Sequence, residues 1–230
     1  TCVVQLIEPV MAGVRPSVSL PGAMPGLGLF FEVEPLGLLF GLVASGLWIL
    51  TSLYGFGYMR GHGESNQTRF FTCFAVAIAA ALGIAFAGDL VTLFLFYEIL
   101  TFSTFPLVTH AGTEAAVRAG RIYLGILVST SVLFLLLAIL WTASISDTLR
   151  FTPGGILDGK IAGASAGLLL LLFVYGVGKA ALMPFHRWLP AAMVAPTPVS
   201  ALLHAVAVVK AGVFTVLKIS IYVFGIDFLA

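Results

Sequence analysis

Five ionisable side chains lie inside long apolar stretches of this sequence, where they could bind and release protons. They are Glu98, Lys179, His204, Lys210 and Lys218. An ionisable group at the middle of a bilayer costs at least ~2.5–3.5 kcal/mol on insertion scales, so each of these residues needs a physical reason to be there. Proton relays are built from such mixed groups, whereas ion-selective pores use rings of like charge or backbone carbonyls. The pattern therefore favours proton movement over ion conduction.

The acidic member of this set is Glu98, in the apolar run 93–100, with no basic residue near it in the sequence. It could be a structural carboxylate that is hydrogen-bonded to a neighbouring helix, or a group that binds and releases a proton. Its place in the middle of an apolar segment favours the second interpretation.

Lys179 is followed five residues later by Pro184, and lysines near a helix end often extend toward the membrane surface. Gly176, Gly178 and Pro184 nevertheless predict a loosened or broken helix, which transport proteins use to expose charge to an internal cavity. A buried lysine can also exchange its proton near physiological pH. We therefore predict that Lys179 lies on a broken helix and pairs with Glu98 across helices.

The last apolar segment carries His204, Lys210 and Lys218. At about 100° per residue the two lysines lie about 80° apart around a helix and could line one side. His204 points elsewhere unless the helix is irregular, but its ring can gain and lose a proton near neutral pH. Lys210 is nearest the middle of the segment, whereas Lys218 could extend to the membrane surface. The predicted relay therefore consists of Glu98, Lys179, His204 and Lys210.

The composition requires a membrane environment. Of the 230 residues, 60% are hydrophobic and 9% are charged, against roughly 25% charged in soluble domains. Such a chain cannot cover a water-facing surface, so we predict one all-α, polytopic transmembrane helix bundle. A net charge of +1 without a basic cluster argues against a nucleic-acid partner. No nucleotide-binding or zinc motif occurs, and Cys2 and Cys73 are far apart, so we expect no cofactor, no metal and no disulfide.

Six segments are long and apolar enough to cross a bilayer, which takes about 20 residues. Their predicted ranges are 36–59, 70–88, 90–109, 122–146, 161–183 and 199–226. Asp89 is expected to cap the third segment, and residues 110–121 are expected to form an amphipathic turn at the surface. Repeated prolines and glycines in residues 1–35 predict the tail of an earlier helix and a loop outside the membrane.

The connecting loops sort onto two faces of the predicted bundle. Loops 60–69, 110–121 and 184–198 hold five arginines, and the loops of the other face hold three basic residues. Cytoplasmic loops are usually richer in lysine and arginine, so we expect the first three loops to face the cytoplasm.

The most specific motif runs from Gly178 to His204 and reads GKAALMPFHRWLPAAMVAPTPVSALLH. It continues through Val209–Phe214 and is preceded by Arg69–Phe71 and Phe94–Glu98. In this order the motifs resemble the proton-conducting antiporter-like family. That family includes the large subunits of Mrp-type Na+/H+ antiporters and the antiporter-like subunits of respiratory complex I and membrane-bound hydrogenases. The resemblance covers about residues 34–230, and from the residues between Met183 and Gly212 we expect the chain to correspond to the D-type subunit of Mrp antiporters.

The resemblance implies a fold of about fourteen helices built from two inverted five-helix repeats. This chain would supply the first repeat, with the broken helix near Lys179. Residues 34–230 would be the transmembrane proton-translocation domain, and residues 1–33 a partial N-terminal segment and loop. Since the second repeat is not in the sequence, we expect a partial chain of a longer protein.

The resemblance also implies roles for individual residues. Glu98 corresponds to the carboxylate that partners a lysine on the broken helix, here Lys179, and His204 and Lys210 correspond to the next relay positions. The expected function is proton translocation in a multisubunit monovalent cation (Na+)/H+ antiporter, with protons and Na+ as the transported ions. The expected partners are the other membrane subunits and the lipid bilayer.

The expected location is the cell (plasma or inner) membrane, with several crossings. The chain would be a transport subunit rather than an enzyme, unless it belongs to a respiratory translocase. The alternative function is a proton-pumping subunit of an NADH:quinone oxidoreductase or a membrane-bound hydrogenase complex.

Overall fold

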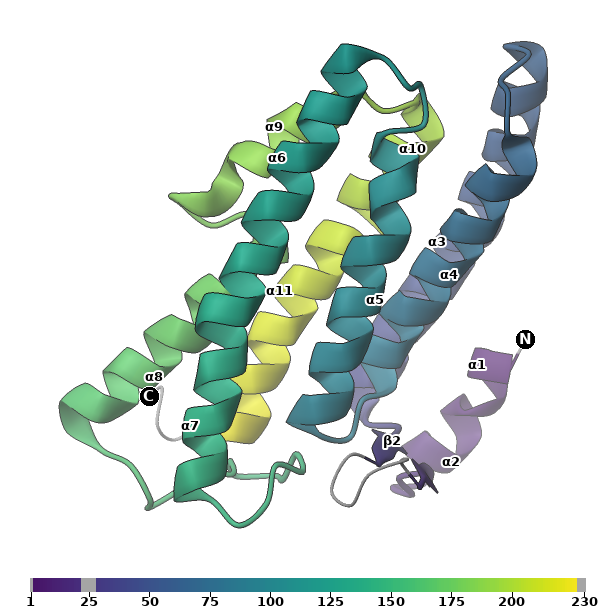
Figure 1. Ribbon diagram of the computed structural model, residues 1–230. Coiled ribbons are helices and arrows are strands. Elements are labelled where there is room, and N and C mark those ends of the chain that lie inside the picture. The colour runs from purple at the N-terminus through teal and green to yellow at the C-terminus, as the bar shows by residue number, and fades with distance from the viewer. Residues whose placement is uncertain (1, 22–27, 227–230) are drawn as a thin grey trace.

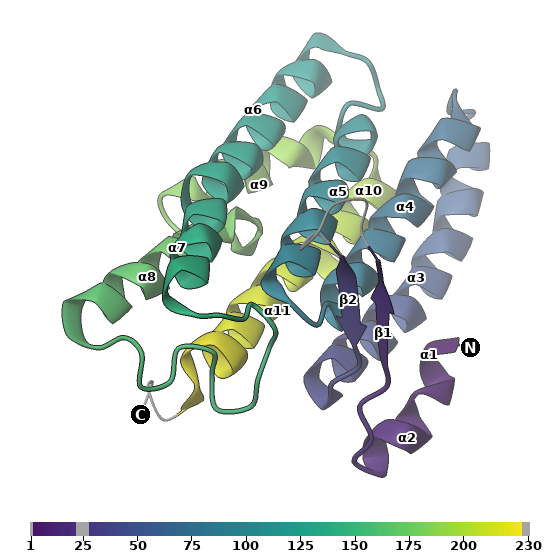
Figure 2. The same ribbon diagram turned by 60° about the horizontal axis from the view of Figure 1, so that its bottom comes forward.

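The computed structural model describes residues 2–21 and 28–226, which form a bundle of long helices with a small β-hairpin at one end (Figures 1 and 2). Five helical segments of the described part are long and apolar enough to cross a membrane. Three of them are single helices: α3 (Pro35–Gly61), α4 (Gln67–Phe86) and α5 (Leu90–Val108). The fourth joins α6 (Glu114–Thr130), the π-helical η1 (Ser131–Leu136) and α7 (Leu137–Ile145). The fifth joins α10 (Thr197–Ala201), the π-helical η5 (Leu202–Val206), α11 (Val208–Ile219) and the π-helical η6 (Ser220–Phe224). The predicted polytopic helix bundle is therefore confirmed.

The fifth predicted segment, 161–183, is a half-length helix followed by a break. Its helix α8 (Gly163–Gly176) has 14 residues, too few for a full crossing. The chain then continues through the 3-10 turns η2 (Gly178–Ala180) and η3 (Phe185–Arg187), the short helix α9 (Trp188–Ala191) and the turn η4 (Ala192–Val194). This confirms the predicted break near Lys179.

The N-terminal region contains an element that the sequence did not predict. After the short helices α1 (Cys2–Gln5) and α2 (Ile7–Met11), strands β1 (Ser17–Leu20) and β2 (Leu29–Glu32) pair antiparallel. The hairpin is attached to the bundle because the Phe30 N–H donates to Thr92 Oγ1 at 2.9 Å and the Gly88 N–H donates to the Phe30 carbonyl at 2.8 Å. It therefore covers the turn between α4 and α5 (Figure 2). The domain boundary between residues 33 and 34 stays a prediction.

Two local predictions had different outcomes. Asp89 caps α5 as expected, because its Oδ1 accepts the Thr92 N–H at 2.6 Å. The surface turn predicted over 110–121 is wrong from Glu114 onward, where α6 begins. Thr113 starts this helix by accepting the Ala116 N–H at 3.2 Å, a side-chain cap that replaces the missing backbone partner.

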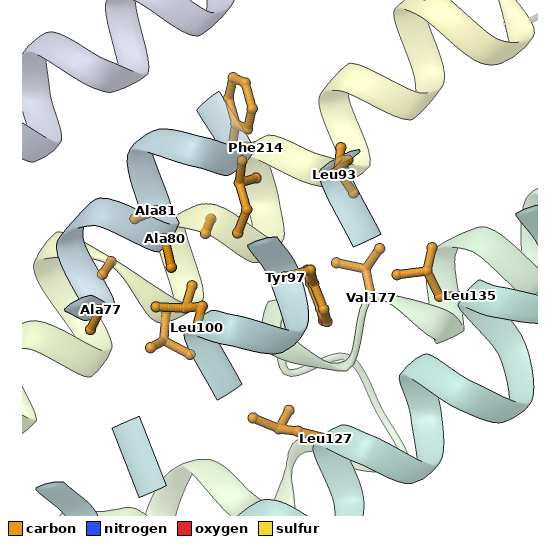
Figure 3. Packing of buried hydrophobic residues seen from close by; sticks show 14 of the residues in the cluster. Ala77, Ala80, Ala81, Leu93, Tyr97, Leu100, Leu127, Leu135, Val177 and Phe214 are labelled. Atoms are coloured by element: carbon orange, nitrogen blue, oxygen red, sulfur yellow. The ribbon is translucent and has the colours of Figure 1, made fainter. Parts of the chain in front are cut away.

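The core is built from the inner faces of α4, α5, α6 and α11, together with Leu135 of η1 and Val177 at the break (Figure 3). The small residues Ala77, Ala80 and Ala81 of α4 let α5 approach closely, as is common between membrane helices. The loops after α3 and α5 and the segment around α9 and α10 lie at one end, opposite the hairpin (Figure 1). The predicted sorting of the loops agrees with this arrangement, while the membrane orientation stays a prediction.

Candidate functional site

The break after α8 is held in place by side chains from other helices. The backbone N–H of Lys179 donates to the Tyr97 hydroxyl at 3.0 Å, and the indole Nε1–H of Trp188 donates to the Gly178 carbonyl at 3.0 Å. Non-helical backbone at membrane depth is tolerated only where its polar groups are satisfied in this way. The break is therefore part of the fold and not a local fraying of α8.

Two glycines allow the break to lie directly against its neighbours. A Cβ atom at Gly178 would collide with Thr130 Oγ1 of α6, and one at Gly212 of α11 would collide with the backbone of Lys179 and Ala180. The break is thus fixed between α6 on one side and α11 on the other. The glycines around Lys179, taken above as signs of a loosened helix, also provide this close packing.

The Lys179 side chain is fully buried, and its ammonium binds neutral oxygens of α5. Nζ donates to the Tyr97 carbonyl at 2.8 Å and to Thr101 Oγ1 at 2.6 Å, and it lies 3.2 Å from the centroid of the Tyr97 ring. Burying an ammonium is costly unless it is paired and hydrogen-bonded. Hydrogen bonds and the ring face therefore take the place of an ion pair.

Glu98 follows Tyr97 on α5 and is half-buried. Its Oε1 atom is buried and has no hydrogen-bond partner among the described residues. No ion pair joins Glu98 to Lys179 in this part of the chain, yet the two charges attract each other through the protein interior. The structure thus brings the two predicted partners to the same site but keeps them apart.

The other two predicted relay residues lie on the run from α10 to η6. His204 is in the π-helical segment η5, with its Nε2 buried and without a partner in the described structure. The helix is thus irregular at His204, as is common near functional positions. Lys210 is exposed on α11, in an open apolar groove that α3 lines on the other side. The structure therefore does not bring Lys210 into the buried cluster around Lys179.

A second buried charge pair was missed by sequence reasoning. Lys218 is fully buried rather than extended toward the membrane surface, so that expectation is wrong. Its Nζ lies 3.2 Å from Oε1 of Glu34, the residue that precedes α3. Lys218 also donates to the carbonyls of Ala87 at 2.6 Å and Ala85 at 3.3 Å. The signal for this pair in the sequence is an acidic residue, Glu34, directly before an apolar helix. Its partner, Lys218, is too distant in the sequence to be identified from that signal.

At the opposite end of the bundle, His110 is buried in the loop after α5. Its Nε2 lies 3.7 Å from Oε2 of Glu64, and its ring packs edge-on against Phe70. Burial lowers the pKa of His110, and the Glu64 carboxylate opposes this effect. The ring is therefore held mainly in its neutral form at neutral pH.

The sequence profile of the family described as "NADH:quinone oxidoreductase/Mrp antiporter, TM" matches residues 87–228, which include the helix break, Lys179 and Lys218. The A1 subunit of a Na(+)/H(+) antiporter from Staphylococcus aureus is 32% identical, over 94% of this chain and 27% of that protein. The A/B subunit of a probable K(+)/H(+) antiporter from Rhizobium meliloti is 32% identical, over 91% of this chain and 22% of that protein.

Among solved structures, the Mrp complex from Dietzia sp. DQ12-45-1b contains a chain that superposes with a TM-score of 0.82 at 28% identity. The superposition covers 98% of this chain and 25% of that one. The present chain thus spans about a quarter of the length of the curated relatives it matches.

Proposed function

This chain belongs to the NADH:quinone oxidoreductase/Mrp antiporter family of membrane proteins, and we propose that it forms a proton-translocating part of a subunit in a multisubunit monovalent cation/H+ antiporter. It is a multi-pass protein of the cell membrane. The observation that carries the proposal is the fully buried ammonium of Lys179 at a helix break, with the half-buried Glu98 carboxylate beside it. Intramembrane ionisable groups of this kind mark ion pathways and proton relays.

The chemistry follows from what holds Lys179. Its two hydrogen-bond partners are neutral, so the amine can lose a proton without leaving a carboxylate unpaired. Approach of Glu98 would favour the ammonium, and separation would favour release of the proton. Alternation between the two arrangements would drive the proton onward, and the structure described above corresponds to the separated arrangement.

The onward path would run through His204 and then Lys210. The unpartnered Nε2 of His204 can accept a proton, and the irregular helix η5 lets its ring turn away from the position of a regular helix. A lysine exposed in an apolar groove at membrane depth is costly unless something covers it. We therefore propose that Lys210 passes the proton to the remainder of the full-length protein.

Antiport is preferred over redox-driven pumping because the relatives that are 32% identical are named as Na(+)/H(+) and K(+)/H(+) antiporter subunits. Those names also favour a subunit of the A type, and the expected assignment to the D type is not confirmed. Na+ and K+ are both candidate cations. The proposed partners are the other membrane subunits of the complex.

The test uses the full-length subunit in its complex, reconstituted in vesicles. A pulse of Na+ or K+ starts exchange, and a pH-sensitive dye reports the proton flux. Glu98→Gln and Lys179→Ala should each lower the flux by at least about 10²-fold, the usual minimum for losing a positioned proton carrier. The control variants Glu114→Gln and Lys160→Ala remove exposed charges and should leave the flux unchanged. Normal flux in both buried variants would refute the proposal.

A further inference from the structure

The hydroxyl of Thr101 is oriented toward the ammonium of Lys179 by its own hydrogen bond. Thr101 Oγ1 donates its proton to the Tyr97 carbonyl at 3.2 Å, one helical turn back, so its lone pairs remain free to accept. The Lys179 ammonium donates to this oxygen at 2.6 Å and to the same Tyr97 carbonyl at 2.8 Å. Two acceptors on one face of α5 therefore form a defined binding position for the ammonium.

The backbone of Lys179 is fixed, so its ammonium can change partners only through the side chain. Its N–H is bound to the Tyr97 hydroxyl at 3.0 Å, and the adjoining backbone packs without a gap against Gly212. A lysine side chain is a flexible four-carbon chain that ends in a compact charge. Movement of the ammonium therefore requires rotation of side-chain bonds and no displacement of the break.

Glu98, the residue after Tyr97 on α5, offers a second acceptor for the Lys179 ammonium. Glu98 Oε1 is buried and has no hydrogen-bond partner in the described part of the chain, and its charge attracts Lys179. A buried acceptor without a partner is costly, and an arriving ammonium would remove that cost. Glu98 and Thr101 are three residues apart on α5, so they lie on neighbouring positions of one helix face. While the ammonium is bound at Thr101 it makes no ion pair with Glu98 in the described part of the chain, so this arrangement uses the Thr101 position alone.

We propose that Thr101, with the Tyr97 carbonyl, is a positioning residue that holds the Lys179 ammonium away from Glu98 and so defines the separated state of the proton switch. This inference rests on the proposed function. In the switch, the ammonium leaves the Glu98 carboxylate, is bound at Thr101 Oγ1, and there loses its proton to the next carrier. The neutral amine then returns toward Glu98 and is protonated again.

The role of the hydroxyl is tested by Thr101→Val, which keeps the shape of the side chain and removes the hydroxyl. A hydrogen bond to a charged group contributes about 1.5–3 kcal/mol, so the population of the separated state should fall roughly 10- to 150-fold. We expect the proton flux of the full-length complex to fall in the same range. Thr101→Ser keeps the hydroxyl and loses the methyl group, and it should restore most of the flux.

Thr104→Val provides a matched control on the same helix. Thr104 is equally buried and also donates to the carbonyl four residues back, but its oxygen bonds the Tyr123 hydroxyl at 2.6 Å instead of Lys179. Its variant should keep the flux at close to the normal level. Wild-type flux in Thr101→Val, or an equal loss in Thr101→Ser, would overturn the inference.

The outcome also separates this inference from the proposed function. If Glu98→Gln and Lys179→Ala abolish flux but Thr101→Val does not, the relay stands and the binding position at Thr101 is refuted. If all three variants keep normal flux, the proton-translocating function itself is refuted. Complex yield and subunit composition, measured in parallel, show whether each variant assembles.

Discussion

Removing one member of the buried pair Glu34–Lys218 should destabilise the bundle far more than removing both. The atoms Oε1 and Nζ lie 3.2 Å apart, and the two residues are 1% and 0% exposed. Loss of one partner of a buried ion pair costs about 3–5 kcal/mol because the other charge stays buried without compensation. Replacement of both partners by neutral groups is often without effect on stability.

The structure sets different expectations for the two single variants. In Glu34→Gln, Lys218 keeps the carbonyl of Ala87 at 2.6 Å and that of Ala85 at 3.3 Å. These acceptors still compensate part of the charge, so the cost should be at the lower end, about 3 kcal/mol. This cost should vary little with pH between neutral and mildly acidic conditions.

In Lys218→Met the cost should depend on pH. Burial raises the pKa of the Glu34 carboxyl above its ordinary value of 4.5, and the ammonium that opposes this effect would be gone. The folded chain would then hold a proton on Glu34 more tightly than the unfolded chain. This contribution to stability is fully present below the unfolded pKa, and it is lost as the pH rises through the folded pKa. The variant should therefore be least stable at high pH.

The assay is a double-mutant cycle on the free energy of unfolding of the full-length subunit in detergent, titrated with sodium dodecyl sulfate. The double variant Glu34→Gln/Lys218→Met should lie within about 1 kcal/mol of the wild type, which gives a coupling energy of at least about 5 kcal/mol. If the costs of the single variants simply add in the double variant, the pair does not stabilise the fold and the reasoning is refuted.

Two further predictions concern packing and pH. Gly212→Ala should destabilise the subunit by about 1–3 kcal/mol and lower its proton flux, because the new methyl group collides with the backbone of Lys179 and Ala180. The stability should also fall as the pH is lowered through about 6.5, because burial lowers the pKa of His110 and the unfolded chain takes up that proton first. Unfolding titrations at several pH values measure both changes in stability, and the vesicle assay measures the flux of Gly212→Ala. His110→Gln should remove this part of the pH dependence.

Each of these predictions has its own control. A Cβ atom at Gly167 of α8 meets no atom within 4 Å, so Gly167→Ala should leave flux unchanged and stabilise the helix slightly. Equal losses in the two glycine variants would contradict the packing argument. An unchanged pH dependence in His110→Gln would assign the effect to another group.

The sequence alone determined the transmembrane elements, because a run of about 20 apolar residues must be buried in lipid and has to satisfy its backbone internally as a helix. It also determined the break near Lys179, since Gly176, Gly178 and Pro184 disfavour a continuous helix. The cap at Asp89 is equally local, as its side chain reaches a backbone N–H three residues on.

The hairpin and the start of α6 were missed for physical reasons. Strands of four residues in a stretch rich in proline and glycine carry little periodic signal, and here they depend on hydrogen bonds to Thr92 and Gly88. Residues 110–121 contain charges that suit a surface turn as well as the exposed face of a first helical turn. The cap at Thr113 decides between the two.

The partners of the buried charges were decided only by the tertiary structure. Spacing along one helix relates Lys210 to Lys218, but the packing of α11 against α4 and η2 leaves the first exposed and buries the second. The same packing sets Lys179 against Thr101 and Lys218 against Glu34. A buried charge is stable only where donors and acceptors from several helices converge, and sequence distance carries no information about that convergence.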